Sequence, residues 1–195
     1  MTSTRLSADF FDRSPIIVAR ELLGQRLVRV LDGQRLAGLI TETEAYNGEE
    51  DLACHARAGL TRRTKIMYGL PGHTYVYFTY GMHWMLNFVT GPGNFPSAVL
   101  LRGVVAVEGL PVIASRRLNR PQAEWTDGPA KICQAFNIDN CLNGHWMCDS
   151  ASQLWVEKEQ PVADEQVAIT ARIGISRVPE PWRSKPWRFL AHLEP

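Results

Sequence analysis

The 195-residue sequence contains only four cysteines, and no two of them form a CxxC pair. They are Cys54, Cys133, Cys141 and Cys148. Cys141 and Cys148 are separated more widely than the cysteine pairs of usual zinc sites. We therefore expect reduced thiols with structural roles, and neither a metal site nor a disulfide framework.

Long apolar runs are also absent. The longest, such as Val104–Val107, cover a few residues, far fewer than a membrane-spanning helix needs. The N-terminal stretch "MTSTRLSADFFDRS" carries early charges and lacks the apolar core of a secretory signal. We expect a cytoplasmic protein with no membrane partner (a nuclear location is equally open in a eukaryote).

Acidic residues are missing from the 56 positions between Asp51 and Glu108, although the net charge of the chain is only +1. In proportion to the 20 acidic residues of the whole chain, about five or six would be expected there. The stretch contains His55, Arg57, Arg62, Arg63, Lys65, His73, His83 and Arg102. Burial excludes charge of both signs and explains the part after Tyr75, but not the basic segment "RAGLTRRTK". This segment predicts a surface that faces an anion.

The length and the pattern of turn signals predict one domain over residues 1–195. Ser14-Pro15 and Gly24 delimit a helix, and Asp32-Gly33 is the turn of a first hairpin. We expect further helices near 111–118 and in "GPAKICQAF", and a long loop at 49–72. Strands are expected at Thr74–Thr79, His83–Val89, "SAVLLRGVVAV", Leu154–Glu157 and Val167–Ile173, before a tail rich in Pro and Trp. The fold class is α+β, with a curved, largely antiparallel sheet, peripheral helices and a protruding β-hairpin.

Two carboxylates lie on one predicted strand face. Period-two alternation places Ile40, Glu42, Glu44 and Tyr46 on the same side. Paired carboxylates suggest glycosidic chemistry, and one carboxylate with a water suffices when the leaving group departs easily. A salt bridge for one glutamate and solvation for the other is an equally weighted alternative.

Arg102 lies in the middle of the apolar strand "AVLLRGVVAV". An unpaired buried charge is costly, so Arg102 needs an anionic partner, and Glu44 or Glu42 is the natural candidate. A purely structural ion pair is the alternative interpretation.

The hairpin "HTYVYFTYGMHWMLNF" places Tyr80 at its tip, beside Gly81. A two-residue turn at Tyr80-Gly81 pairs Tyr77 with Trp84, whereas a three-residue loop pairs Tyr75 with Asn87 and moves Asn87 to the face of Tyr77. Tyr80 is exposed in either register. An exposed aromatic beside a basic segment can wedge between nucleic-acid bases, although a tip tyrosine more often packs on a neighbouring loop.

Several segments together resemble the alkyladenine (3-methyladenine) DNA glycosylases of the human-enzyme type, from about Ser14 to Phe189. The resemblance is carried, in this order, by "ETEAYNGEEDLACHARAGLTRRTKIMY", "PGHTYVYFTYGMHWMLN", "AVLLRGVVAVEGL", "DGPAKICQAF", and "ARIGI" followed by "KPWRF". It implies a DNA-repair enzyme that flips alkylated or deaminated purines out of duplex DNA. Such an enzyme hydrolyses the N-glycosidic bond with a glutamate-activated water, needs no cofactor, has no lyase activity and acts as a monomer, associated with the nucleoid in a bacterium.

The resemblance also implies roles for individual residues. Glu44 matches the general base, Arg102 helps to hold the water and the carboxylate, and the carbonyl of Ile173 is a further contact for the water. The residues that enclose the extruded base are Tyr46, His55, Tyr77 and Asn87, of which Asn87 disfavours the amino group of normal guanine. Tyr80 matches the intercalating residue. Contacts to the DNA backbone are assigned to Arg57, Arg63, Lys65 and Lys131.

Two other functions compete with this interpretation. A non-catalytic nucleic-acid-binding module could use Tyr75, Tyr77 and Tyr80 as an aromatic stacking platform. It would have no use for Arg102 and Glu44 meeting inside the fold. An O-glycoside hydrolase could use Glu42 and Glu44, but the basic stretch 52–107 and the tip tyrosine argue against a sugar groove.

Overall fold

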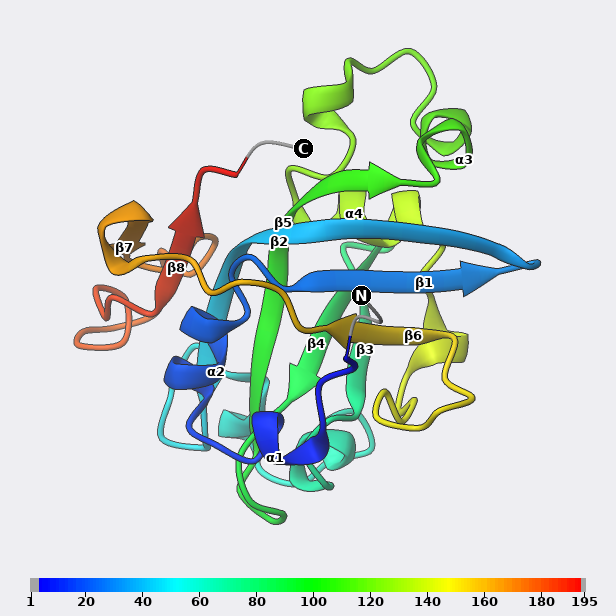
Figure 1. The fold of residues 1–195 in the computed structure, drawn as a ribbon. Helices are drawn as coiled ribbons and strands as arrows, with labels where there is room; N and C mark the ends of the chain where they lie inside the picture. The colour runs from blue at the N-terminus through cyan, green and yellow to red at the C-terminus, as the bar shows by residue number, and fades with distance from the viewer. Residues whose placement is uncertain (1–3, 194–195) are drawn as a thin grey trace.

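The computed structural model describes residues 4–193 and arranges them around one antiparallel sheet (Figure 1). Six strands follow the order β3-β4-β5-β2-β1-β6, and β8 pairs with both β2 and β7. The strands are β1 (Arg26–Leu31), β2 (Gln34–Asn47), β3 (Thr74–Thr79), β4 (His83–Val89), β5 (Ser97–Glu108), β6 (Leu154–Glu157), β7 (Val167–Thr170) and β8 (Arg188–Ala191). The helices are α1 (Ala8–Phe11), α2 (Pro15–Glu21), α3 (Leu110–Arg116) and α4 (Pro129–Phe136), with short 3₁₀ turns η1 (His55–Ala58), η2 (Lys65–Tyr68), η3 (Gln122–Glu124), η4 (Asn140–Leu142) and η5 (Asp164–Gln166). The predicted α+β class is confirmed.

The first hairpin forms where the sequence predicts it. Leu31 pairs with Gln34, and the two residues between them, Asp32 and Gly33, have φ of 51° and 74°. Positive φ at both central positions is the geometry that joins twisted strands through a two-residue loop, which Asp-Gly adopts readily.

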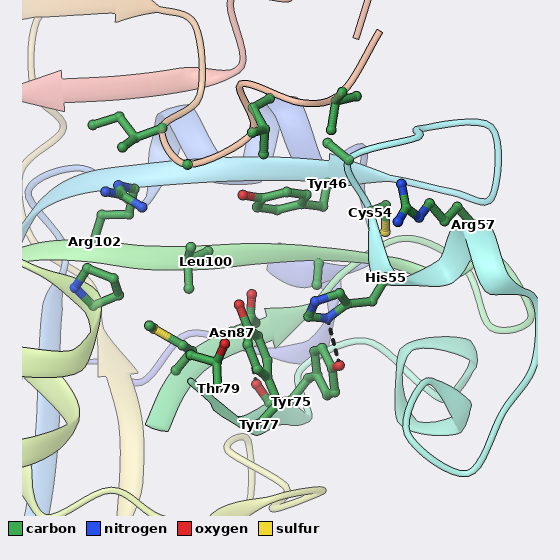
Figure 2. A pocket seen from close by; sticks show the side chains of 18 of the residues that line it. Tyr46, Cys54, His55, Arg57, Tyr75, Tyr77, Thr79, Asn87, Leu100 and Arg102 are labelled. Carbon is green, nitrogen blue, oxygen red and sulfur yellow. Dashed lines mark hydrogen bonds between the residues drawn. The ribbon is translucent and has the colours of Figure 1, made fainter. Parts of the chain in front are cut away.

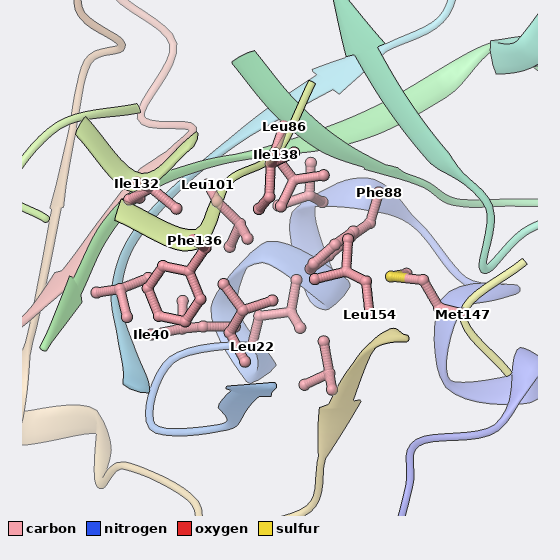
Figure 3. Close-up of a cluster of buried hydrophobic side chains, with 14 of the residues drawn as sticks. Leu22, Ile40, Leu86, Phe88, Leu101, Ile132, Phe136, Ile138, Met147 and Leu154 are labelled. Carbon is pink, nitrogen blue, oxygen red and sulfur yellow. The ribbon is translucent and has the colours of Figure 1, made fainter. Parts of the chain in front are cut away.

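A β-bulge in β2 overturns one prediction. Pairing with β5 passes from Ile40↔Val104 directly to Glu42↔Gly103, so that Thr41 is left unpaired. The extra residue reverses the alternation, and Ile40 lies in the main core instead of beside Glu42 (Figure 3). The prediction that Ile40 shares a face with Glu42 was therefore wrong. Gly103 fits the bulge because a Cβ there would lie 2.7 Å from Oγ1 of Thr41.

The two faces of the sheet have different environments. One face packs against α2 and α4 in a single apolar core (Figure 3), to which β5 contributes Val99 and Leu101. Leu100 and Arg102 of β5, which alternate with these core residues, line a cavity on the opposite face. Because strand side chains alternate, the buried strand β5 serves the core and the cavity at once.

The second hairpin adopts the three-residue loop. Tyr75 pairs with Asn87 and Thr79 with His83, so Tyr80, Gly81 and Met82 form the tip. Tyr80 has φ of 53° and is 81% exposed. The prediction that Tyr80 is displayed is confirmed, and the left-handed backbone holds it away from the sheet.

The C-terminal part differs from expectation. The strand predicted to reach Ile173 ends at Thr170, and the tail contains an unpredicted strand, β8, which pairs with both β7 and β2. Short, Pro-flanked strands give a weak sequence signal, and β8 depends on the edge that the bulged part of β2 offers it.

The helices described in residues 4–193 are all too short or too polar to span a membrane. In the same residues, no cluster of three or more His, Cys, Asp or Glu side chains is arranged to hold a metal ion.

Candidate active site

A cavity of about 730 Å³ lies on the sheet face opposite the main core (Figure 2). Strands β2 to β5 form its floor, and residues 52–57 and 173–178 form two of its walls. Its lining contains Tyr46, Cys54, His55, Arg57, Tyr75, Tyr77, Tyr80, Asn87, Leu100, Arg102 and Ile173. All the base-enclosing residues and the tip residue of the sequence prediction therefore border one space.

Glu44 is completely buried, and it contacts Tyr46, Arg102 and Ile173, which line the cavity. Two hydrogen-bond donors and one guanidinium hold its carboxylate. Its Oε2 accepts a 2.8 Å hydrogen bond from the Tyr46 hydroxyl, and its Oε1 accepts a 2.7 Å bond from the backbone N–H of Ile173. The Arg102 Nε lies 3.4 Å from the same Oε1. Burial raises the pKa of Glu44 above its ordinary value, and Arg102, the Ile173 N–H and the Tyr46 hydroxyl oppose this rise. Glu44 is thus a more basic carboxylate held in one orientation.

Arg102 bridges both glutamates. Its Nε lies 2.9 Å from Oε1 of Glu42, closer than it lies to Glu44. Arg188 of β8 donates a 2.6 Å bond to the same Glu42 oxygen. The predicted pairing of Arg102 with a carboxylate is confirmed with both candidates, and Glu42 acts as the anchor that fixes the arginine beside Glu44.

Aromatic rings enclose the space in front of these charges. Figure 2 shows Tyr46 on one side of the cavity and His55 with Tyr77 on the other. The rings of His55 and Tyr77 meet edge to face with centroids 4.6 Å apart, and the hydroxyl of Tyr75 lies 2.9 Å from Nδ1 of His55. Two aromatic walls across an open space can stack on a flat heterocycle.

His55 is held in the neutral form. Burial, with smaller contributions from the charges of Arg63 and Arg57, lowers its pKa to about 4. At pH 7 its ring therefore contributes a hydrogen-bonding edge rather than a positive charge. Cys54, next to it, has its thiol pKa raised to about 12 by burial, so it remains a protonated, structural side chain.

Asn87 is also tied to its surroundings. Its Nδ2 donates a 3.0 Å hydrogen bond to the carbonyl of Tyr75, and the residue is only 4% exposed. The three-residue hairpin loop brings it to the cavity face, as the corresponding register predicts.

The four residues predicted to contact the DNA backbone lie in different parts of the structure. Arg57 donates to the carbonyl of Leu52 at the cavity wall, whereas Lys65 is exposed. The guanidinium of Arg63 lies 4.9 Å from the ring centroid of Tyr77. Lys131 is on α4 and forms an ion pair of 2.7 Å with Asp127. Their assignment to DNA stays a prediction, and Arg63 also supports the aromatic wall.

Sequence reasoning missed the buried ion pair between Arg172 and Asp51, in which both side chains are completely buried. A signal was present, because Asp51 is the last acidic residue before the long acid-free stretch and Arg172 belongs to the segment "ARIGI". It also missed the Ile173 N–H as a donor to Glu44, since backbone contacts have no sequence signal of their own.

Comparison with known proteins gives a consistent result. The methylpurine-DNA glycosylase family matches residues 9–195 of this chain. A relative from Carboxydothermus hydrogenoformans is 44% identical over 184 residues, which cover 94% of this chain and 93% of the relative. A relative from Methanocella arvoryzae is 44% identical over 191 residues, with 97% and 94% covered. Both carry the provisional name 3-methyladenine DNA glycosylase.

Proposed function

This chain belongs to the methylpurine-DNA glycosylase family, a family of DNA-repair hydrolases, and we propose that it extrudes damaged purines from duplex DNA and hydrolyses their N-glycosidic bond with a water activated by Glu44. It acts as a monomer. The observation that carries the proposal is that Arg102 and the Tyr46, His55 and Tyr77 rings line one cavity with the exposed tip residue Tyr80. Arg102 and Tyr46 also contact the buried carboxylate of Glu44.

Extrusion is the first requirement, because a base inside the stack is closed to attack at C1′. Removing it from the duplex costs a few kcal/mol. The exposed ring of Tyr80 fills the space that the nucleotide leaves, which offsets part of this cost. The basic residues around the cavity attract the phosphate backbone, in agreement with the absence of acidic residues from 52 to 107.

The aromatic walls then hold the base. Alkylated purines such as 3-methyladenine are cationic, and stacking against the faces of Tyr46 and Tyr77 gives a cation–π attraction of about 0.5–2 kcal/mol. The neutral state of His55 matters here, since an imidazolium would repel a cationic base. Asn87 disfavours the exocyclic amino group of normal guanine.

The chemical step uses the buried carboxylate. Arg102 and Ile173 both contact Glu44 and both line the cavity, so a water bound between them reaches the carboxylate. Glu44 accepts a proton from that water, the oxygen attacks C1′, and the purine leaves with the electrons of the N-glycosidic bond. The carbonyl of Ile173 offers a further acceptor for the water. The pKa of Glu44, raised by burial, makes it a stronger base than an exposed glutamate.

The nucleophile is a water and not an amine. Among the described residues, those that line the cavity include Arg57, Arg102 and Arg177 but no lysine. A Schiff base between enzyme and sugar therefore has no side-chain amine to form it, and the enzyme leaves the DNA strand intact.

The proposal is tested by incubating the protein with duplex DNA that has been methylated at purines. We expect release of free methylated purine and abasic sites that cleave only after alkali. Tight binding without free purine would support the non-catalytic binding module with an aromatic stacking platform. Strand cleavage without alkali would overturn the monofunctional assignment alone.

A further inference from the structure

The buried ion pair of Arg172 and Asp51 takes no part in the proposed mechanism. It nevertheless lies next to the cavity, because Arg172 contacts the ring of Tyr46. The guanidinium donates from Nη1 and Nη2 to the two carboxylate oxygens of Asp51, at 2.5 and 2.9 Å. Nη1 also donates to the carbonyl of Ala45 at 2.9 Å, and Nη2 to the carbonyl of Trp182 at 3.2 Å. One side chain thus joins β2, the loop after it and the C-terminal tail.

The same guanidinium also lies over the ring of Tyr46. Its Cζ lies 4.7 Å from the ring centroid of Tyr46 and 5.0 Å from that of Trp187. Tyr46 lines the cavity and donates its hydroxyl to Glu44. Stacking by an arginine that is itself fixed at four acceptor atoms restricts the position of that hydroxyl.

Arg172 is also the residue directly before Ile173, whose backbone N–H donates to Glu44. The exposed Ile173 side chain has little packing to hold it, with 47% of its surface accessible. The buried side chain of the preceding residue is therefore the main fixed point of this segment. Both hydrogen-bond donors to Glu44 therefore depend on Arg172, the Ile173 N–H through the chain and the Tyr46 hydroxyl through a stacked ring.

We propose that Arg172, clamped by Asp51, is a positioning residue that aligns the Ile173 N–H and the Tyr46 hydroxyl on the Glu44 carboxylate. This rests on the proposed function of Glu44 as the base. Arginine is required because a lysine ammonium has no planar fork to reach Asp51 and both carbonyls at once.

Loss of the Arg172 side chain is expected to change the pH dependence of the rate in one direction. Hydrogen bonds to a carboxylate favour its ionised form, so loosening two donors raises the pKa of Glu44 further. Several groups facing Glu44 remain unchanged in an Arg172 variant: Arg102 of β5, Glu42 of β2 and Tyr77 of β3, with Arg188 of β8 paired to Glu42. The base must be ionised to act. The rate therefore falls most at low pH and recovers as the pH rises.

The test compares single-turnover release of purine from methylated duplex DNA by wild type, Arg172→Lys and Arg35→Lys between pH 5 and 9. Arg35 serves as a control for an arginine with the same kinds of contact outside the cavity lining, because it pairs with Glu157 at 2.7 Å and lies 5.8 Å from the Trp155 ring, although its side chain is 34% exposed. We expect Arg172→Lys to lose about tenfold more rate at pH 5.5 than at pH 8, and Arg35→Lys to keep the wild-type profile. A uniform loss across the pH range would show a structural role only and overturn the proposal.

Breaking a buried pair from one side leaves an unpaired charge and can unfold the chain. The double variant Arg172→Gln with Asp51→Asn removes both charges, and it replaces Arg172→Lys if the latter does not fold. The same selective loss at low pH is expected, and a uniform loss contradicts the proposal as before. Absence of activity in wild type and Arg35→Lys would instead reject the proposed function itself, so the two failures are distinguishable.

Discussion

The hydroxyl of Tyr46 donates a 2.8 Å hydrogen bond to Oε2 of Glu44, two residues earlier on the same strand. Residues two apart on a strand share a face, so the backbone itself sets this contact. In the proposed mechanism, this bond gives Tyr46 a part in proton transfer at Glu44 in addition to the proposed stacking on the extruded nucleobase.

Tyr46→Phe keeps the ring and removes the donor. A hydrogen bond to a charged group contributes about 1.5–3 kcal/mol, so we expect base release to slow by about 10–100-fold, most strongly at low pH. The effect is strongest at low pH because loss of the Tyr46 hydrogen bond raises the pKa of Glu44, so that a larger fraction of the carboxylate is protonated. Single-turnover rates across pH measure the effect. Tyr68→Phe, which loses a bond to Glu49 outside the cavity, is the matched control, and equal losses in both variants would exclude a special role for Tyr46.

The partly buried, neutral imidazole of His55 predicts a stability change at acid pH. Its pKa of about 4 in the folded chain lies below that of an unfolded histidine, about 6.5. Between these values the unfolded state binds more protons, so wild type loses stability as the pH falls from about 6.5 to about 4. His55→Gln removes this contribution. Thermal unfolding at several pH values should show a smaller decline for the variant, and parallel declines would mean that His55 is not buried as a neutral ring.

The exposed ring of Tyr80 at the hairpin tip predicts a binding defect that depends on whether the lesion is base-paired. Tyr80→Ser removes an exposed ring, so folding should be little affected. We expect about tenfold weaker binding to a lesion in a stable base pair and little change on single-stranded DNA, where no stack must be opened. Met82→Ser, which alters another exposed position of the tip, serves as control. Equal affinities of wild type and Tyr80→Ser for the paired lesion would rule out the wedge.

The local pattern of the sequence was sufficient for most of the sheet. Asp32-Gly33 determined the first hairpin, and the run with Arg102 at its centre identified the buried strand that lines the cavity. The exposure of Tyr80 followed from its place beside Gly81, although the choice between two loop lengths needed the observed pairing of Tyr75 with Asn87. These features depend on neighbours close in sequence.

The remaining features depend on contacts between distant segments. The bulge at Thr41 arises where β2 meets Gly103 of β5, so alternation alone misplaced Ile40. Arg172 pairs with Asp51 across 121 positions, and Ile173 reaches Glu44 across 129. No periodicity connects such residues, and only the closed fold brings them together.

The most direct test of the account is the Glu44→Gln variant, measured for both binding and base release on the same lesion-containing duplex. The amide keeps the shape of the carboxylate but cannot accept the proton of the water. Glu42→Gln is the matched control on the same strand, and a partial loss is expected because Arg102 keeps its contact with Glu44. We predict that Glu44→Gln binds the duplex like wild type and releases no purine. Full excision by Glu44→Gln would contradict the account, and complete loss in both variants would favour a mechanism with two carboxylates.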